Sequence, residues 1–99
     1  MNPASIIHAC CLVFQVTEQQ LCSRCKQVNI VEARHAAMFL MRRKTDLRLK
    51  QIADSVGCMN HAAVIHANKS FRDKLDTEAP LRAKVLECEQ LSFVNSGNP

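Results

Sequence analysis

The chain has 99 residues and a formal net charge of +4, from 13 Lys and Arg against 9 Asp and Glu. That length suits one domain and leaves no room for a large ATPase or polymerase. An apolar fraction of 47% argues against intrinsic disorder, and no apolar run approaches the ~20 residues of a transmembrane span. With 2 Gly, 3 Pro and Phe as the only large aromatic residue, the composition favours helices over a β-sandwich.

The first third of the chain predicts two helices and a polar connection. Apolar residues spaced three and four apart predict a helix over residues 3–14, with Asn2 as its cap. Thr17 is expected to cap a short second helix, which Leu21 anchors. Residues 23–29 are polar and basic, and we expect them to connect this helix to the next one.

Further helices are predicted in the rest of the chain. Good helix formers and apolar stripes mark them, with Gly57 as a stop residue and Asn60 as a cap. Their expected ranges are 30–44, 49–56, 61–75 and 80–91, followed by a polar, frayed tail over residues 92–99. The sequence therefore predicts a single all-α domain over residues 1–99, with five to six helices around one core.

The positive charge is concentrated in one segment. Residues 24–50 hold eight basic residues against Glu32 and Asp46, a balance of 8 − 2 = +6, whereas the rest of the chain is at −2. The basic residues are Arg24, Lys26, Arg34, Arg42, Arg43, Lys44, Arg48 and Lys50. Such a basic patch attracts phosphate groups, although the charge alone fits a solvated helix face better.

The six cysteines are expected to be free thiols in a cytoplasmic protein. No Lys or Arg precedes the first apolar stretch, so a secretory signal peptide is not predicted. Cys22 and Cys25 form a CxxC pair, for which zinc would need two more ligands. Cys58, His61 and His66 could supply them, but His61 and His66 are five residues apart, which is poor spacing for one helical face. A redox pair would need a preceding strand, so we expect incidental thiols, no metal and no cofactor.

The centre of the chain carries a helix-turn-helix pattern over residues 49–66. The small residue Ala53 allows two helices to approach closely, and Gly57 fits a turn that disfavours side chains with a Cβ atom. Ile52 and Val64 are placed to pack the two helices together. Ordinary helical corners look similar, so the pattern alone leaves both DNA binding and a structural corner open.

Most of the chain, over about residues 6–91, resembles the C-terminal DNA-binding domain (domain IV) of the bacterial chromosomal replication initiator DnaA. The most specific stretch is GCMNHAAVIHA over residues 57–67, where the family motif is G-G-R-D-H-T-T-V-x-H-A. The matches are Gly57, His61, Val64, His66 and Ala67. Residues 32–40 resemble the family's A-R-x-x-A-M-Y-L helix, and residues 21–26 stand where it has a basic L-x-S-K-R-R-type loop.

The resemblance implies a TrpR-like, all-α fold that binds double-stranded DNA. One helix would enter the major groove, and a basic loop would reach the backbone or the adjacent minor groove. Recognition of a DnaA-box-like sequence, in bacterial replication or its regulation, is the implied role. No GxxxxGK[ST] motif occurs, so no nucleotide is expected, and the chain resembles a free-standing, divergent module.

The resemblance also implies the residues that contact DNA. Arg34 is expected on phosphate or in the minor groove, and Asn60 and His61 are the best base readers, with helix capping as their alternative role. The full set is Arg24, Lys26, Arg34, Arg48, Lys50, Asn60, His61, Ala62, Ala63, His66 and Lys69. Several motif positions depart from the family: among them, Met59 and Asn60 replace Arg-Asp, and Ala62 and Ala63 replace two Thr. The two alanines can touch a thymine methyl group but cannot donate a hydrogen bond.

Two other classes of function stay open. The departures allow a degenerate DnaA-like module that acts in protein–protein interaction without binding DNA. An enzyme is the weakest alternative, because the sequence has no Ser/His/Asp arrangement, paired carboxylates or nucleophile elbow. We therefore expect no catalytic residue.

Overall fold

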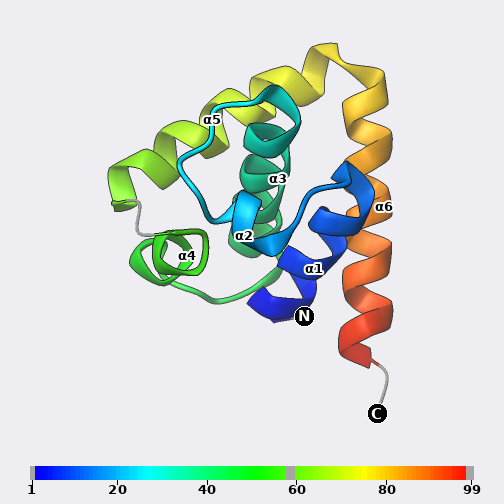
Figure 1. Ribbon diagram of the computed structural model, residues 1–99, viewed down its shortest axis with the longest axis horizontal. Coiled ribbons are helices and arrows are strands. Elements are labelled where there is room, and N and C mark those ends of the chain that lie inside the picture. The colour runs from blue at the N-terminus through cyan, green and yellow to red at the C-terminus, as the bar shows by residue number, and fades with distance from the viewer. Residues whose placement is uncertain (1, 58–59, 98–99) are drawn as a thin grey trace.

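The protein is all-helical in the part of the chain that the structure, a computed structural model, describes: residues 2–57 and 60–97. The elements are α1 (Pro3–Phe14), α2 (Glu18–Leu21), α3 (Val28–Lys44), α4 (Leu49–Ser55), α5 (His61–Thr77) and α6 (Ala79–Gly97). Figure 1 shows α3 at the centre, with α4 and α6 on opposite sides of it. The predicted all-α fold with a central helix-turn-helix is confirmed.

Three helices begin at the caps that the sequence predicts. The Oδ1 atom of Asn2 accepts a hydrogen bond from the Ser5 amide at 2.8 Å. Thr17 and Gln20 form a reciprocal capping box, with distances of 2.9 and 3.0 Å. Asn60 caps α5 in the same way as Asn2 caps α1. Each cap satisfies an amide that the first turn of a helix leaves without a partner.

The last helix is longer than predicted. α6 continues to Gly97, so the expected frayed tail from residue 92 is wrong for residues 92–97. Ser92 is buried, and its hydroxyl donates to the Cys88 carbonyl oxygen at 2.7 Å. This internal bond satisfies the hydroxyl inside the core, so the polar residue does not end the helix.

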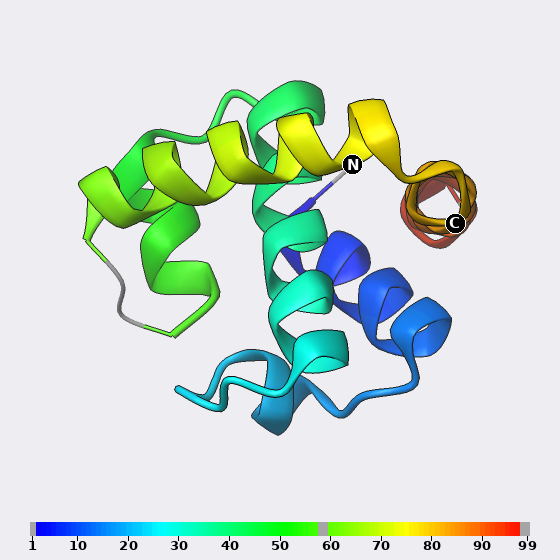
Figure 2. The ribbon, with the colours of Figure 1, turned by 90° about the horizontal axis from the view of Figure 1, so that it is seen from above.

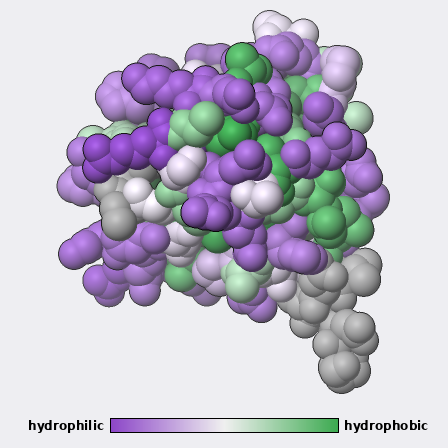
Figure 3. All heavy atoms as spheres, viewed as in Figure 1, coloured by the Kyte–Doolittle hydropathy of each residue, from purple (hydrophilic) through white to green (hydrophobic). Residues whose placement is uncertain are grey.

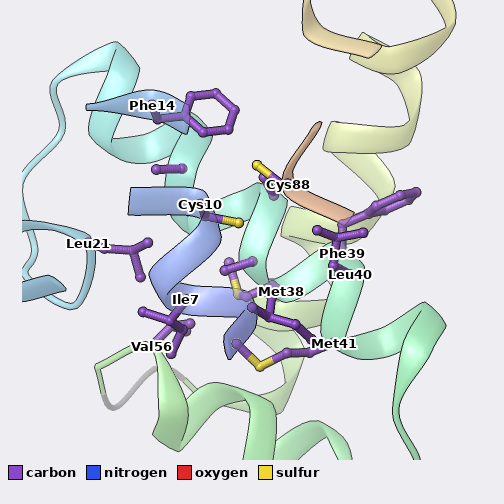
Figure 4. Close-up of a cluster of buried hydrophobic side chains, with 14 of the residues drawn as sticks. Ile7, Cys10, Phe14, Leu21, Met38, Phe39, Leu40, Met41, Val56 and Cys88 are labelled. Carbon is purple, nitrogen blue, oxygen red and sulfur yellow. The ribbon is translucent and has the colours of Figure 1, made fainter. Parts of the chain in front are cut away.

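The central helix α3 supports the other elements. It packs against α1, α2, α4 and α5, while α6 lies along α1. Its buried residues include Ala33, Ala36 and Ala37, whose small side chains allow close approach of neighbouring helices. Figure 4 shows the larger core side chains, with Met38 and Met41 between α1 and the helix-turn-helix. An ion pair of 2.9 Å between Lys44 Nζ and Glu89 Oε1 joins the end of α3 to α6.

The cysteines of the described chain are free thiols, as expected. Cys10 and Cys88 face one another between α1 and α6 (Figure 4), and their hydrogen bond, together with burial, raises the pKa of Cys10 far above its ordinary value. Burial raises the pKa of Cys11 to about 11. These thiols therefore stay protonated near neutral pH and belong to the core. Cys58 lies outside the described residues.

Candidate nucleic-acid interface

The turn of the helix-turn-helix packs directly on the basic loop, which is the segment of residues 22–27 between α2 and α3. Gly57, at the end of α4, has a positive φ of 106°. A Cβ atom at this position would lie only 2.1 Å from the Cys22 carbonyl oxygen. Only glycine fits both the conformation and the space. The Cys22 thiol also donates to the Ser55 carbonyl oxygen at 3.6 Å, so the loop and the turn touch at two points.

α5 turns one stripe of residues to solvent. Ala62, His66 and Lys69 are exposed and follow a spacing of four and three residues, which places them on one helical face. The opposite face is buried through Val64, Ala67 and Phe71. We call Ala62, His66 and Lys69 the exposed stripe. A helix that enters a groove of DNA needs a face of this kind, on which the side chains are exposed.

Phe71 anchors α5 on α3. Its ring lies 5.5 Å from the ring of Phe39 and meets the ring of His35 edge-on, with 6.4 Å between centroids. Burial, with smaller contributions from Arg34 and Lys74, lowers the pKa of His35. The imidazole is therefore neutral near pH 7 and acts as part of the packing.

The two predicted base readers at the start of α5, Asn60 and His61, have different surroundings. Asn60 Oδ1 accepts from the Ala63 amide at 2.8 Å. An asparagine that pairs with adenine uses its oxygen and its nitrogen together, so Asn60 would have to share its oxygen between the cap and the base. His61 is exposed at the first helical position, and Ala63 is half-buried beside it. Met59 and Cys58 of the same motif lie outside the described residues.

The structure brings Lys69 close to the start of α4. Lys69 and Leu49 line a hollow of about 830 Å³, and Arg48 and Lys50 flank Leu49 with exposed side chains. Three arginines that were not among the predicted contacts, Arg42, Arg43 and Arg72, line the same hollow. The basic segment 24–50 already contained the first two, but only the fold places them beside α5.

The basic loop presents Arg24 and Lys26 to solvent. Its backbone is ordered by short-range bonds, since Ser23 Oγ donates to the Gln20 carbonyl oxygen at 2.6 Å and accepts from the Cys25 amide at 3.1 Å. Both exposed basic side chains thus project from a fixed loop beside the turn. Figure 3 shows hydrophilic side chains on the side of α4 and the start of α5, and more hydrophobic ones toward α6.

Arg34, which is expected to contact DNA, lies under the basic loop in the structure. Arg34 is only 7% exposed. Its Nε donates to the Leu21 carbonyl oxygen at 2.7 Å, and its Nη2 donates to the Cys25 carbonyl oxygen at 3.1 Å. The guanidinium is occupied by the loop backbone because α3 places it under the loop. A direct contact with phosphate is therefore not what this arrangement offers.

The described residues form neither a metal-binding cluster nor a membrane-spanning helix. No group of three or more His, Cys, Asp and Glu side chains gathers there as a metal site would require. None of the described helices is long and apolar enough to cross a membrane.

Comparison with known proteins gives one consistent result. Residues 3–70 match the family described as "Bacterial dnaA protein helix-turn-helix". The chain is 35% identical over 79 residues to the chromosomal replication initiator protein DnaA of Porphyromonas gingivalis, which covers 80% of this chain and 17% of the relative. It is 34% identical over 86 residues to the DnaA of Lacticaseibacillus casei, covering 87% of this chain and 19% of the relative. The chain thus spans less than a fifth of the length of these relatives.

Proposed function

This chain belongs to the family of bacterial DnaA helix-turn-helix domains, and from that premise we propose that it binds double-stranded DNA. α5 would lie in the major groove, and the basic loop would lie on the neighbouring backbone or in the minor groove. The relatives are named as chromosomal replication initiators. We propose a corresponding role for this bacterial chain in replication or its regulation, in the cytoplasm and without an enzymatic activity.

One observation carries this proposal: the loop with the exposed bases packs on the end of α4, directly before the helix that carries the exposed stripe. The contact between Gly57 and the Cys22 carbonyl fixes the loop beside the turn that precedes α5. A duplex presents a groove and its flanking phosphates at a fixed spacing, so a protein gains from holding its two contact elements at a fixed spacing too.

The proposed contacts divide by chemistry. His61 and His66 would read base edges, and the exposed Ala62 and the half-buried Ala63 offer only apolar contact with thymine methyl groups. The phosphate contacts would come from exposed basic side chains: Arg24, Lys26, Arg48, Lys50 and Lys69. This division predicts substantial affinity from phosphates and weaker discrimination between sequences than a motif with two Thr would give.

A salt titration of DNA binding tests the proposal. Fluorescence anisotropy would follow the wild-type chain on a duplex with the family's DnaA box and on a scrambled duplex of equal length. Contact with about five phosphates predicts a slope of log affinity against log salt near about −4.5. An affinity that hardly changes between low and moderate salt would count against DNA binding.

Single substitutions separate the two kinds of contact. Lys69→Ala should weaken binding equally on both duplexes and make the slope about 0.9 less steep. His66→Ala should weaken binding mainly on the box duplex. Lys84→Ala is the matched control, because Lys84 lies on α6, with its ammonium 5.2 Å from the centre of the Phe14 ring. It should leave both isotherms unchanged.

The alternative function, protein–protein interaction without DNA, has its own outcome in this experiment. It predicts no salt-dependent binding to either duplex and no effect of the Lys69 substitution. The loss of the family's Arg, Asp and both Thr in the motif is the feature that keeps this alternative in view.

A further inference from the structure

The guanidinium of Arg34 lies beneath the basic loop and donates hydrogen bonds to the backbone at two places. One donor reaches the carbonyl of Leu21, the last residue of α2, and another reaches the carbonyl of Cys25 in the loop. The end of a helix leaves carbonyl groups without partners, and it favours a positive charge. Arg34 thus satisfies the end of α2 and, with the same planar group, holds the loop that follows.

The segment between the two carbonyls is also held from its other side. Cys22 lies between them, and it is the residue whose carbonyl meets Gly57 and whose thiol bonds to the Ser55 carbonyl. The loop is therefore clamped between α3, through Arg34, and the end of α4. Arg24 lies inside the clamped segment and Lys26 just beyond it, and both side chains are exposed.

The choice of an arginine at this buried position is itself informative. No ion pair of Arg34 is found among the described residues, and its two bonds go to neutral carbonyls. Burying an unpaired charge costs free energy, so an apolar residue would serve packing at lower cost. A planar group with several donors, in contrast, fixes two carbonyls at a defined separation.

We propose that Arg34 is a positioning residue, which holds the basic loop against the helix-turn-helix so that Arg24 and Lys26 meet the same duplex as α5. Its effect on DNA binding passes entirely through the loop. The predicted effect of Arg34 on DNA binding rests on the proposed function. The hold of Arg34 on the loop is a property of the free protein and does not depend on that function.

The first test needs no DNA. Amide hydrogen exchange would be measured at Cys22, Ser23 and Cys25, whose amides are all hydrogen-bonded. Arg34→Ala and Arg34→Lys should both speed this exchange. If the loop loses the stabilisation of one hydrogen bond, the exchange rate should rise about tenfold. Arg82→Ala is the matched control, because its Nη1 also donates to a helix-end carbonyl, that of Leu75, at 2.5 Å on the far side of the molecule. Exchange unchanged in both Arg34 variants, with native circular dichroism, would overturn the clamp.

The second test is a mutant cycle on DNA. The four chains are the wild type, Arg34→Ala, the double variant Arg24→Ala/Lys26→Ala, and the triple variant. A positioning role predicts that the triple variant binds as the double variant does and that Arg34→Ala makes the salt slope about 1.8 less steep, as for two lost phosphate contacts. Additive losses, with a slope change of about 0.9 from Arg34→Ala, would identify a direct phosphate contact instead.

Arg34→Lys keeps the test decisive if Arg34→Ala does not fold. Lysine retains the charge but not the planar pair of donors, so a positioning role predicts weakened binding, whereas a direct phosphate contact predicts binding close to that of the wild type. Failure of the wild-type chain to bind any duplex would overturn the proposed function. The exchange measurement would still decide whether Arg34 holds the loop.

Discussion

α5 and the basic loop both contact the region of α4, yet the protein holds them in different ways. α5 is capped by its own first residues and anchored by apolar side chains, with Phe71 against α3. In the basic loop, Cys22 and Cys25 are only partly buried against the core. The loop is held in addition by the polar donors of Arg34 and by the backbone contact with Gly57.

The difference shows which element tolerates change. Apolar packing is roughly additive and adapts to similar side chains, whereas a clamp of buried hydrogen bonds fails when one partner is lost. α5 should therefore survive substitutions along its exposed stripe, while the loop should depend on a few residues that never touch DNA.

The largest effect is expected from removing the anchor of α5. Phe71→Ala deletes a fully buried ring, and we expect a loss of about 3–5 kcal/mol in the free energy of unfolding. Denaturant titration followed by circular dichroism measures it. Phe71→Leu keeps most of the apolar contact and should lose clearly less. Equal, small losses in both variants would show that α5 does not depend on this anchor.

The next effect concerns the point where the two elements touch. Gly57→Ala places a Cβ atom against the Cys22 carbonyl and forces a positive φ on a residue that disfavours it. We expect a loss of about 2–4 kcal/mol. The same titration checks it, with Ser70→Ala on the exposed face of α5 as a control that should stay within about 0.5 kcal/mol. A neutral Gly57→Ala variant would mean that the loop is free to move away from the turn.

A smaller effect is expected at the start of α5. Asn60→Ala removes the cap and should cost about 1 kcal/mol, whereas Asn60→Ser retains a capping oxygen and should cost little. If Asn60 acts only as a cap, the Ser variant also keeps its affinity for DNA. Loss of binding by the stable Ser variant would instead make Asn60 a base reader.

The same contrast explains how much could be predicted from the sequence. The caps Asn2, Thr17 and Asn60 act over three residues, so local reading found them. The contacts of Arg34 join residues 13 and 9 positions apart, and nothing local distinguishes this arginine from the exposed bases around it. The sequence therefore places Arg34 in the family pattern but does not predict its hydrogen bonds to the loop.

Two further features show the same limit. Gly57 was correctly predicted as a turn residue, but its contact with Cys22 depends on how the loop after α2 packs on the end of α4. Ser92 was taken as part of a polar tail because its hydroxyl is polar, whereas the fold buries it and its hydroxyl bonds to the Cys88 carbonyl one turn back on the same helix. Local chemistry thus predicts where helices begin, and tertiary contacts decide which residues are buried and how loops are held.

The smallest effect is a dependence of stability on pH, which arises at the anchor of α5. Burial lowers the pKa of His35 below its ordinary value of 6.5, so the unfolded chain takes up a proton at a higher pH than the folded chain does. Stability contributed by neutral His35 is therefore fully present above about pH 6.5 and declines as the pH falls from there through the lowered pKa. Denaturant titrations at pH 7.5 and pH 5.5 would measure the decline, and His35→Gln, which cannot titrate, should reduce it. An identical pH dependence in the wild type and the variant would place the titrating group elsewhere and remove His35 from the anchor of α5.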